Sequence, residues 1–498
     1  MRRRDFLKAV GLGAASVITA GCERTARTFA VGSEANQPNI LWLISEDTSP
    51  DLGCYGNELV RTPNLDKLAR EGALFTNAFA SSPVCSPTRS AFMTGMYQTS
   101  IGAHQHRSHR SDGYVLPEPV KVITEYFRQA GYFTANVTTA AAGVRGTGKM
   151  DFNFSCPEPF DGTDWNQRRD GQPFYAQVNF NLTHRSFQRD SSNPINPQKV
   201  SLPPYYPDHP LARRDWADYL ESIQIIDAQI GRVLKRLENE GLLENTIVFY
   251  FGDHGRPHVR GKQWLYEGGI RIPLIIHWPG HIKPGLVTDE LVSSIDFGPT
   301  SLNLAGIKVP GHMQGQVFLG PDKKTRSYIF AARDRCDETV DRIRCVRKKR
   351  YKYIRNFFPN RPYTQFNAYK KYEYPLLTLM EVLAKRGELT AEQMGFMAAT
   401  RPKEELYDLE KDPYELHNLA DDSRYRQILK ELRSVLNEWI EQTGDQGRIP
   451  EDRETIEYWK RQASEEYQDI MNRRRISPQV SAQEYLRWWE DKLLWKQE

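Results

Sequence analysis

The stretch NILWLIS, residues 39–45, is followed at once by Glu46 and Asp47. It is a nearly continuous apolar run, which is typical of a strand that is buried on both faces of a parallel sheet. A second run of the same kind, TIVFYFG, occupies residues 246–252. Two such strands predict a sheet at the centre of the fold, and the first of them ends in two acidic side chains.

Further predicted strands also end in polar residues. Asp253 and His254 follow the second apolar run, and a third predicted strand, Phe174–Asn181, runs into His184. A fourth, Tyr132–Thr138, precedes a glycine-rich loop. One acid after a strand is usually a turn residue or a helix cap, but ligands of parallel α/β sheets bind beyond the carboxyl ends of the strands. The repeated placement therefore favours a site at this edge.

Helices are predicted between these strands. Thr62 and Pro63 form an N-cap and a first turn ahead of residues 64–71. The best apolar helical face runs from about Asp215 to Glu240 and ends at Gly241. Strands that alternate with helices indicate an α/β fold with a mostly parallel sheet.

The composition excludes several classes of protein. Among the 498 residues, 39% are hydrophobic and 26% are charged, an ordinary balance for a globular protein with a substantial core. A disordered chain, a collagen-like repeat and a small disulfide scaffold are excluded. The formal net charge is +4, but residues 1–22 hold four basic residues and one acid, so the remainder is close to neutral. A nucleic-acid partner needs a basic domain or stripe, and none is expected here.

Residues 1–22 have the features of an export signal. The sequence RRDFLK, beginning at Arg3, resembles the twin-arginine motif and precedes an apolar run, Ala9–Ala20. That run is shorter than the roughly 20 residues that span a membrane. It ends in AGC, which is similar to a lipoprotein cleavage box, so a lipid-anchored Cys22 and simple cleavage both stay open. We expect a bacterial protein that the twin-arginine translocase exports to the periplasm, the cell envelope or the exterior, with membrane contact only through an anchor at Cys22.

The most informative segment is SSPVCSPTRSAFMTG, residues 81–95. Cys85 lies directly ahead of a helix-compatible stretch, where backbone N–H groups and the helix dipole favour an anion. From the residues alone, Cys85 is either a reactive thiolate or a small buried cysteine.

The pattern C-x-P-x-R, formed by Cys85, Pro87 and Arg89, resembles the signature of the formylglycine-dependent sulfatases of the alkaline-phosphatase-like superfamily. Further segments match that family in the same order, so the resemblance spans residues 38 to about 445. It implies an α/β fold with a mixed, mostly parallel sheet flanked by helices and a smaller C-terminal antiparallel-sheet domain. The further matching segments are Glu46-Asp47, Gly146–Lys149, Gly252–Gly255, Lys262–Gly269 and Glu405–Leu419.

The resemblance also divides the chain into parts. A sulfatase catalytic domain is expected at residues 38–326 and a C-terminal sulfatase subdomain at residues 327–445. Within the latter, residues 363–402 look like a helical insertion. Residues 446–498 are charged and rich in tryptophan, and we expect a helical tail. Its aromatic residues, among them Trp488, Trp489 and Trp495, either pack on the core, which is favoured, or stack on sugars.

In that family the motif cysteine is oxidised to formylglycine by a formylglycine-generating enzyme, and the hydrated aldehyde is the nucleophile. Cys85 would be this residue. A divalent cation, Ca²⁺ or Mg²⁺, is implied as well, because attack by one anion on another needs concentrated positive charge. His254 is the least typical ligand, since an oxygen donor would suit Ca²⁺ better. The implied ligands are Glu46, Asp47, Asp253, His254 and the modified Cys85.

Other matching residues have implied roles in the reaction. Arg89, Lys149 and Lys262 would bind the sulfate oxygens. His184 would protonate the departing sugar oxygen, a task for a group that titrates near neutrality. The family usually has a histidine two residues after the lysine that matches Lys149, where this chain has Asp151. Asp151 either acts as a base in sulfate release or only caps or hydrogen-bonds the loop.

Two basic clusters are candidates for substrate binding. The first, residues 104–110, contains three histidines and two arginines, and the second lies just after His254. Both would suit an anionic glycan, but a solvated loop or structural histidines explain them nearly as well. The candidates are His104, His106, Arg107, His109, Arg110, Arg256, His258 and Arg260.

The leading hypothesis is thus an exported, cation-dependent sulfatase that acts on O-sulfates or N-sulfates of a sulfated carbohydrate. Two alternatives remain. A phosphonate or phosphate-ester hydrolase of the same superfamily would use the same nucleophile, since these anions resemble sulfate. A catalytically silent glycan-binding protein is disfavoured by the presence of Cys85, Arg89, Lys149, His184 and Lys262.

Overall fold

The computed structural model of the chain describes residues 37–108 and 112–495. The expected export signal with Cys22, and the candidates His109 and Arg110, lie outside these described residues. Residues Gln37–Glu498 form one compact unit, so the domain boundary expected after residue 326 stays a prediction. Within the described ranges, no helix is long and apolar enough to cross a membrane.

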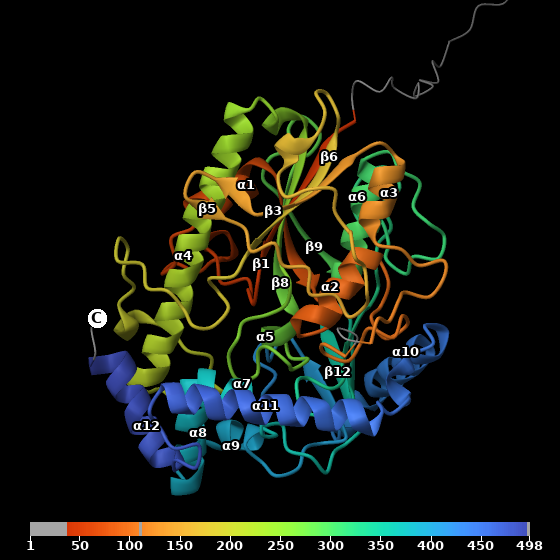
Figure 1. Cartoon of the computed structure of the whole chain (residues 1–498). Coiled ribbons are helices and arrows are strands. Elements are labelled where there is room, and N and C mark those ends of the chain that lie inside the picture. The colour runs from red at the N-terminus through yellow and green to blue at the C-terminus, as the bar shows by residue number, and fades with distance from the viewer. Residues whose placement is uncertain (1–36, 109–111, 496–498) are drawn as a thin grey trace, which may run out of the picture. The chain divides into compact units, whose positions relative to one another are not determined.

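A seven-stranded sheet forms the centre of this unit (Figure 1). Its strands, in spatial order, are β3 (Phe133–Val137), β6 (Phe174–Phe180), β1 (Asn39–Ser45), β7 (Thr246–Gly252), β8 (Arg271–His277), β2 (Ala73–Phe79) and β9 (Leu286–Ser293). β1 is parallel to both of its neighbours, β6 and β7. β8 runs antiparallel to β7 and β2, whereas β2 and β9 are parallel. The sheet is therefore mixed and mostly parallel, which confirms the expected fold.

The two central strands form where the apolar runs predict them. Every residue of β1 and β7 is buried. Alternate side chains of β1 point to opposite faces of the sheet. Leu41 and Leu43 belong to the core on one face, and Trp42 belongs to the core on the other. Because both faces are covered, the strand reads as a continuous rather than an alternating apolar run.

Helices cover both faces of the sheet. α1 (Pro63–Glu71) and the 30-residue α4 (Pro210–Asn239) contribute to the core on one face. α2 (Cys85–Thr94), α3 (Ile123–Gln129) and α6 (Phe297–Leu304) contribute to the core on the other. The shorter elements are β4 (Thr139–Ala141), β5 (Val144–Arg145) and α5 (Glu267–Ile270).

A second sheet has four antiparallel strands, which confirms the smaller C-terminal sheet. Its strands in order are β10 (Ile329–Arg333), β11 (Ile343–Arg347), β12 (Tyr351–Asn356) and β13 (Glu404–Asp408). The helix α10 (Arg426–Gln442) packs on this sheet through an apolar face.

Further helices lie between β12 and β13 and in the tail. The segment expected as an insertion forms α7 (Ala368–Glu373), α8 (Pro375–Arg386) and α9 (Ala391–Phe396). The tail forms α11 (Arg453–Arg473) and α12 (Ala482–Glu490), and a short turn of π-helix, Asp491–Trp495, follows. Figure 1 shows α11 crossing below the end of the sheet toward which β1 runs.

Candidate active site

The carboxyl ends of β1 and β7 meet because these strands are parallel neighbours. Asp47 follows β1 closely, and Asp253 and His254 follow β7 directly. Cys85 is the first residue of α2 and reaches the same point. One potential ligand atom from each of these four buried side chains lies within 4.8 Å of the others. The structure thus brings together four residues that the sequence predicts in one site.

The Cys85 thiol lies among charged groups. Its Sγ is 3.1 Å from Nε2 of His254 and 3.9 Å from Oδ1 of Asp47. Burial raises the pKa of the thiol, but the positive charges of Lys149, Lys262 and His254 outweigh burial, and the net effect lowers the pKa. The site therefore stabilises negative charge at position 85, as a nucleophile requires.

The two aspartates are held by opposite charges. Lys262 Nζ lies 2.8 and 3.0 Å from the carboxylate oxygens of Asp47. Arg89 donates to Asp253 from Nη2 and Nε, at 3.0 and 3.2 Å. Burial raises the pKa of Asp47, but Lys262 and His254 hold it well below its usual range. The pKa of Asp253 is also lowered, by His254 and Arg89 against the effect of burial, so both carboxylates are ionised.

Glu46 lies beside this cluster. Its carboxylate accepts a hydrogen bond from Lys149 Nζ at 2.8 Å and lies 4.0 Å from Arg89. Lys149 is also 3.7 Å from a carboxylate oxygen of Asp151. Among the described residues, the cluster with metal-ligand spacing does not include Glu46, so its role as a ligand stays a prediction.

The cluster fits a divalent cation. Nδ1 of His254 donates to the Gly255 carbonyl at 2.9 Å, so Nε2 is the nitrogen that lies 3.0 Å from Asp47. Burial opposes a charged imidazole, but Asp253, Cys85 and Asp47 raise the pKa of His254 to about 10. This position attracts positive charge, either a proton or a metal ion. A sulfur donor suits a softer metal, whereas an oxygen at position 85 would match Ca²⁺ or Mg²⁺.

His184 follows β6, the strand on the other side of β1. Its Nδ1 donates to the carbonyl of Arg185 at 2.9 Å, which leaves Nε2 for a second partner. Arg185 is fixed in turn by a bidentate ion pair with Asp215, at 2.6 and 2.7 Å. Burial, reinforced by Lys262, lowers the pKa of His184 below its ordinary value of 6.5. The ring is therefore oriented and is neutral in the free site at pH 7.

A cavity of about 170 Å³ opens beside Cys85. Besides Cys85, four predicted residues line it, namely Lys262, His184, His106 and Arg107. Most of its other lining residues belong to α7, α11 and the loop after β10, where no motif marks them. The high tryptophan content of the tail was the one feature of the sequence that indicated a role for this region. The lining residues that the sequence did not predict are Gln263, Asp337, Glu338, Ala368, Tyr369, Tyr372, Trp459, Gln462, Ala463 and Glu466.

A neighbouring cavity of about 630 Å³ is lined by Lys149 and Asp151 and shares Arg107 with the first. Three residues of these walls have left-handed backbone conformations: φ is 64° at Arg107, 53° at Asp151 and 77° at Gln263. Such angles are uncommon outside glycine and concentrate at functional sites. The walls of both cavities therefore contain strained backbone positions of the kind that is found at functional sites.

The structure separates two candidates of the first basic cluster. His106 lines the cavity beside Cys85, and its Nδ1 lies 2.9 Å from a carboxylate oxygen of Asp337. Burial lowers the pKa of His106 to about 3, so this histidine is neutral. His104 lines a different cavity, together with Gln446.

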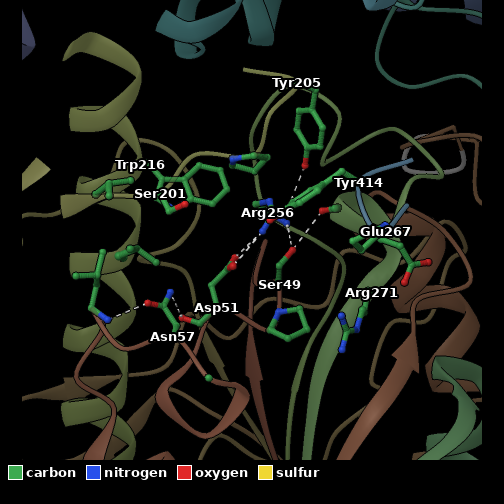
Figure 2. Close-up of a pocket in the computed structure, with 18 of the residues that line it drawn as sticks. Ser49, Asp51, Asn57, Ser201, Tyr205, Trp216, Arg256, Glu267, Arg271 and Tyr414 are labelled. Carbon is green, nitrogen blue, oxygen red and sulfur yellow. Dashed lines mark hydrogen bonds and ion pairs between the residues drawn. The ribbon is translucent and has the colours of Figure 1, made fainter. Parts of the chain in front are cut away.

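Arg256, from the second basic cluster, lies in a cleft of about 650 Å³ (Figure 2). Its Nη1 is 2.9 and 3.0 Å from the carboxylate oxygens of Asp51. The guanidinium also lies over the ring of Trp216, 4.8 Å from the centroid. Figure 2 shows the side chains of Tyr205 and Tyr414 beside it. Cys85 does not line the described part of this cleft.

His258 and Arg260 have structural partners. Nε2 of His258 lies 3.4 Å from the carboxylate of Asp215. Arg260 donates to the Glu415 carbonyl at 2.7 Å and covers the ring of Tyr266, 3.9 Å from its centroid. Neither residue lines the described part of the cavity beside Cys85, so the structure does not bring the second basic cluster to the nucleophile.

Comparison with protein families gives two matches. The model described as Sulfatase matches residues 38–307. The model described as N-sulphoglucosamine sulphohydrolase, C-terminal, matches residues 252–374. The first of these ranges includes Asp47, Cys85, Asp253 and His254.

Individual relatives point in the same direction. An ulvan-active sulfatase from Formosa agariphila is 36% identical over 502 residues, covering 89% of this chain and 82% of the relative. The N-sulphoglucosamine sulphohydrolase of Homo sapiens is 26% identical over 471 residues, covering 82% and 91%.

Solved structures share the fold. One is BT4656 in complex with its substrate D-glucosamine-2-N,6-O-disulfate, with a TM-score of 0.59, 19% identity and coverage of 82% of this chain and 99% of that chain. Another is the phosphonate monoester hydrolase of Agrobacterium radiobacter, with a TM-score of 0.60, 19% identity and coverage of 82% and 96%. At this identity the likeness establishes the alkaline-phosphatase-like fold alone.

Proposed function

Because this chain belongs to the sulfatase family, we propose that it hydrolyses sulfate esters of a sulfated carbohydrate, with position 85 as its nucleophile. Family membership makes it a sulfuric ester hydrolase. The observation that carries the mechanism is the position of the buried Cys85 Sγ, 3.1 Å from His254 and in one cluster with Asp47 and Asp253. Formylglycine at this position, formed by a formylglycine-generating enzyme, would provide a hydrated aldehyde whose oxygen attacks the sulfur of the ester.

A divalent cation, Ca²⁺ or Mg²⁺, would be held by Asp47, Asp253, His254 and the oxygen at position 85. When bound, it would supply positive charge against the sulfate and the attacking oxygen. Glu46 is a further proposed ligand. Its contact with Lys149 supports a position at the border of the cluster rather than at its centre.

Two lysines are suited to bind the sulfate. Lys149 and Lys262 both act electrostatically on Cys85 and lower its pKa, so they surround the point at which an anion would react. Arg89 is different, because its side chain is buried and its donors are used by Asp253 and, at 2.8 Å, by Asn179. We therefore assign Arg89 to holding Asp253 in place.

His184 is the proposed general acid. Its Nδ1 is occupied by the Arg185 carbonyl, so the proton for the departing sugar oxygen would come from Nε2. Asp151 lies 3.7 Å from Lys149. This contact supports a role in holding Lys149 and its loop, one of the two hypotheses for Asp151.

The names of the relatives support a sulfated glycan as the substrate class. One relative is an ulvan-active sulfatase and another is an N-sulphoglucosamine sulphohydrolase. The chain's own cavity supports the same class, because it combines Lys262 and Arg107 with the rings of Tyr369 and Tyr372.

The export of the protein is proposed from residues 1–22. We propose that the twin-arginine translocase delivers it to the periplasm, the cell envelope or the exterior. Fractionation of source cells and determination of the mature N-terminus test this proposal. A mature chain that begins at a lipid-modified Cys22 supports anchoring, and an unprocessed chain in the cytoplasm contradicts export.

A panel of substrates tests the proposed reaction. The protein, produced together with a formylglycine-generating enzyme, is assayed on 4-nitrophenyl sulfate, ulvan oligosaccharides, N-sulfated glucosamine and a 4-nitrophenyl phosphonate ester. We expect the highest kcat/KM on a sulfated sugar. A higher kcat/KM on the phosphonate would favour the alternative hydrolase, and glycan binding without turnover would favour a silent binding protein.

A further inference from the structure

We propose that the tail helix α11 forms the sugar-binding wall of the catalytic cavity, with Trp459 as the platform on which a pyranose ring of the sulfated glycan stacks. This inference rests on the proposed function, since it gives the sulfated substrate its carbohydrate subsite. α11 lies outside the ranges matched by the two family models, 38–307 and 252–374. Neither family model therefore accounts for this subsite.

The position of Trp459 follows from the face that α11 turns inward. Trp459, Ala463, Tyr467 and Met471 are spaced four residues apart, so they share one face of the helix. Ala463, Tyr467 and Met471 are buried against the body of the protein. At Trp459 the same face meets the cavity that contains Cys85. The helix is thus anchored along one part of this face and lines the cavity along the next.

The indole of Trp459 is held in place by neighbouring side chains. The guanidinium of Arg335 lies over the ring, 5.4 Å from its centroid. Arg335 is in turn fixed by an ion pair with Glu451 and by donation to the Asp337 carbonyl at 2.6 Å. A ring that is already fixed loses little conformational entropy when a ligand stacks on it. This support suits a binding platform.

A second contact fixes α11 beside the cavity. The Tyr372 hydroxyl, in α7, donates to the Glu466 carboxylate at 2.6 Å. Both residues line the cavity, and so does Gln462. The tail wall therefore offers amide and carboxylate groups next to the indole, and these groups can hydrogen-bond sugar hydroxyls.

The cavity has the composition and the size for one sulfated ring. Lys262 and Arg107 supply cationic groups, and Tyr369, Tyr372 and Trp459 supply aromatic rings. The three carboxylates of the lining are already engaged within the protein, Asp337 by His106, Glu338 by the Ala368 N–H and Glu466 by Tyr372. Sugar rings present apolar faces and polar edges, and aromatic rings with a few placed polar groups match both. The volume of about 170 Å³ is below the roughly 300–1,000 Å³ that takes a drug-sized ligand. We therefore expect one ring of the glycan to enter.

Three variants test the platform: Trp459→Ala, Trp459→Phe and Trp495→Ala. Trp495 is the matched control, because it is an exposed tryptophan of the tail that does not line the described cavity. The assays measure kcat/KM on ulvan oligosaccharides and on 4-nitrophenyl sulfate, with melting temperatures for all proteins. N-sulfated glucosamine replaces ulvan if the wild-type protein prefers it.

We expect Trp459→Ala to lower kcat/KM on the sugar at least about tenfold, as for the loss of a central aromatic anchor. The effect on 4-nitrophenyl sulfate should be smaller, Trp459→Phe should recover most of the loss, and Trp495→Ala should match the wild type. Equal loss on both substrates, or no loss on the sugar, would overturn the subsite while leaving the proposed function intact. A wild-type protein that hydrolyses no sulfated sugar would overturn the proposed function itself.

Discussion

Cys85 Sγ lies 3.1 Å from Nε2 of His254, although 169 positions separate the two residues in the sequence. The contact arises because the N-terminus of α2 lies, in space, beside the C-terminal end of β7. Asp47 and Asp253 complete the same buried cluster. The proposed nucleophile and the proposed ligands of the cation therefore form one unit, and a change in either should affect both.

Replacement of Cys85 should abolish the reaction. We expect Cys85→Ala to lower kcat on 4-nitrophenyl sulfate by at least about a thousandfold, as for the removal of a nucleophile. Cys345→Ala is the matched control, because Cys345 is also a buried free thiol but lies in β11. Each variant should lose about 1 kcal/mol of stability. Comparable activities of the two variants would rule out position 85 as the nucleophile.

Removal of the cation should remove activity and stability together. Without a cation, the charges of Asp47 and Asp253 are balanced only by side chains such as Lys262 and Arg89. A ligand present at a hundred times its Kd stabilises the folded state by about 2.7 kcal/mol. After treatment with a chelator, we expect a lower melting temperature and lost activity, both restored by Ca²⁺ or Mg²⁺. Full activity in a sample whose metal content is negligible by elemental analysis would exclude the cation from the reaction.

The pH dependence should report His184. Burial and Lys262 lower its pKa below 6.5, and a general acid acts only while it is protonated. As pH rises through this lowered pKa, the protonated fraction falls, so kcat/KM should decline already below pH 6.5. His184→Gln should remove this decline and cost about 10²–10⁴-fold in rate. An unchanged profile in the variant would show that another group supplies the proton.

The ion pair behind His184 should contribute strongly to stability. Asp215 binds Arg185 through two hydrogen bonds, and both side chains are almost completely buried. Asp215→Asn would leave a buried guanidinium without its partner, which typically costs about 3–5 kcal/mol. Urea denaturation should reveal a loss in this range. A loss as small as that of an exposed ion pair would contradict the role assigned to this contact.

The same pair sets a direction for acid sensitivity. Arg185 and His258 hold the pKa of Asp215 below its ordinary value of 3.8, against the effect of burial. A group with a lowered pKa in the folded state stabilises the fold above its unfolded pKa, and this contribution disappears as pH falls. The wild type should therefore lose stability below about pH 4, and Asp215→Asn should lose less over the same range.

The sequence predicts the central strands and the reactive cluster for a physical reason. β1 and β7 are covered on both faces of the sheet, so both strands consist almost entirely of apolar residues. The acids that follow these strands mark the carboxyl edge of the sheet. Cys85 was added to Asp47, Asp253 and His254 through the resemblance of its motif to that of the sulfatases. The inner strand β8 and the edge strand β9 were not predicted, because no candidate catalytic residue follows either of them directly.

The walls of the cavity could not be predicted in the same way. His104 and His106 are close in sequence, yet they line different cavities, because side-chain direction depends on backbone conformation and not on spacing. Arg256 carries a charge that looks suited to substrate but is paired with Asp51. Trp459 reaches the cavity only because the tail folds back on α7, and no local pattern encodes that contact.

The most direct test of the proposed nucleophile is the mass of the peptide that contains Cys85, measured in a preparation with demonstrated sulfatase activity. Position 85 should carry formylglycine, seen as the aldehyde or its hydrate, and the modified fraction should track the specific activity. An active preparation in which this peptide carries only the unmodified thiol would contradict this proposal.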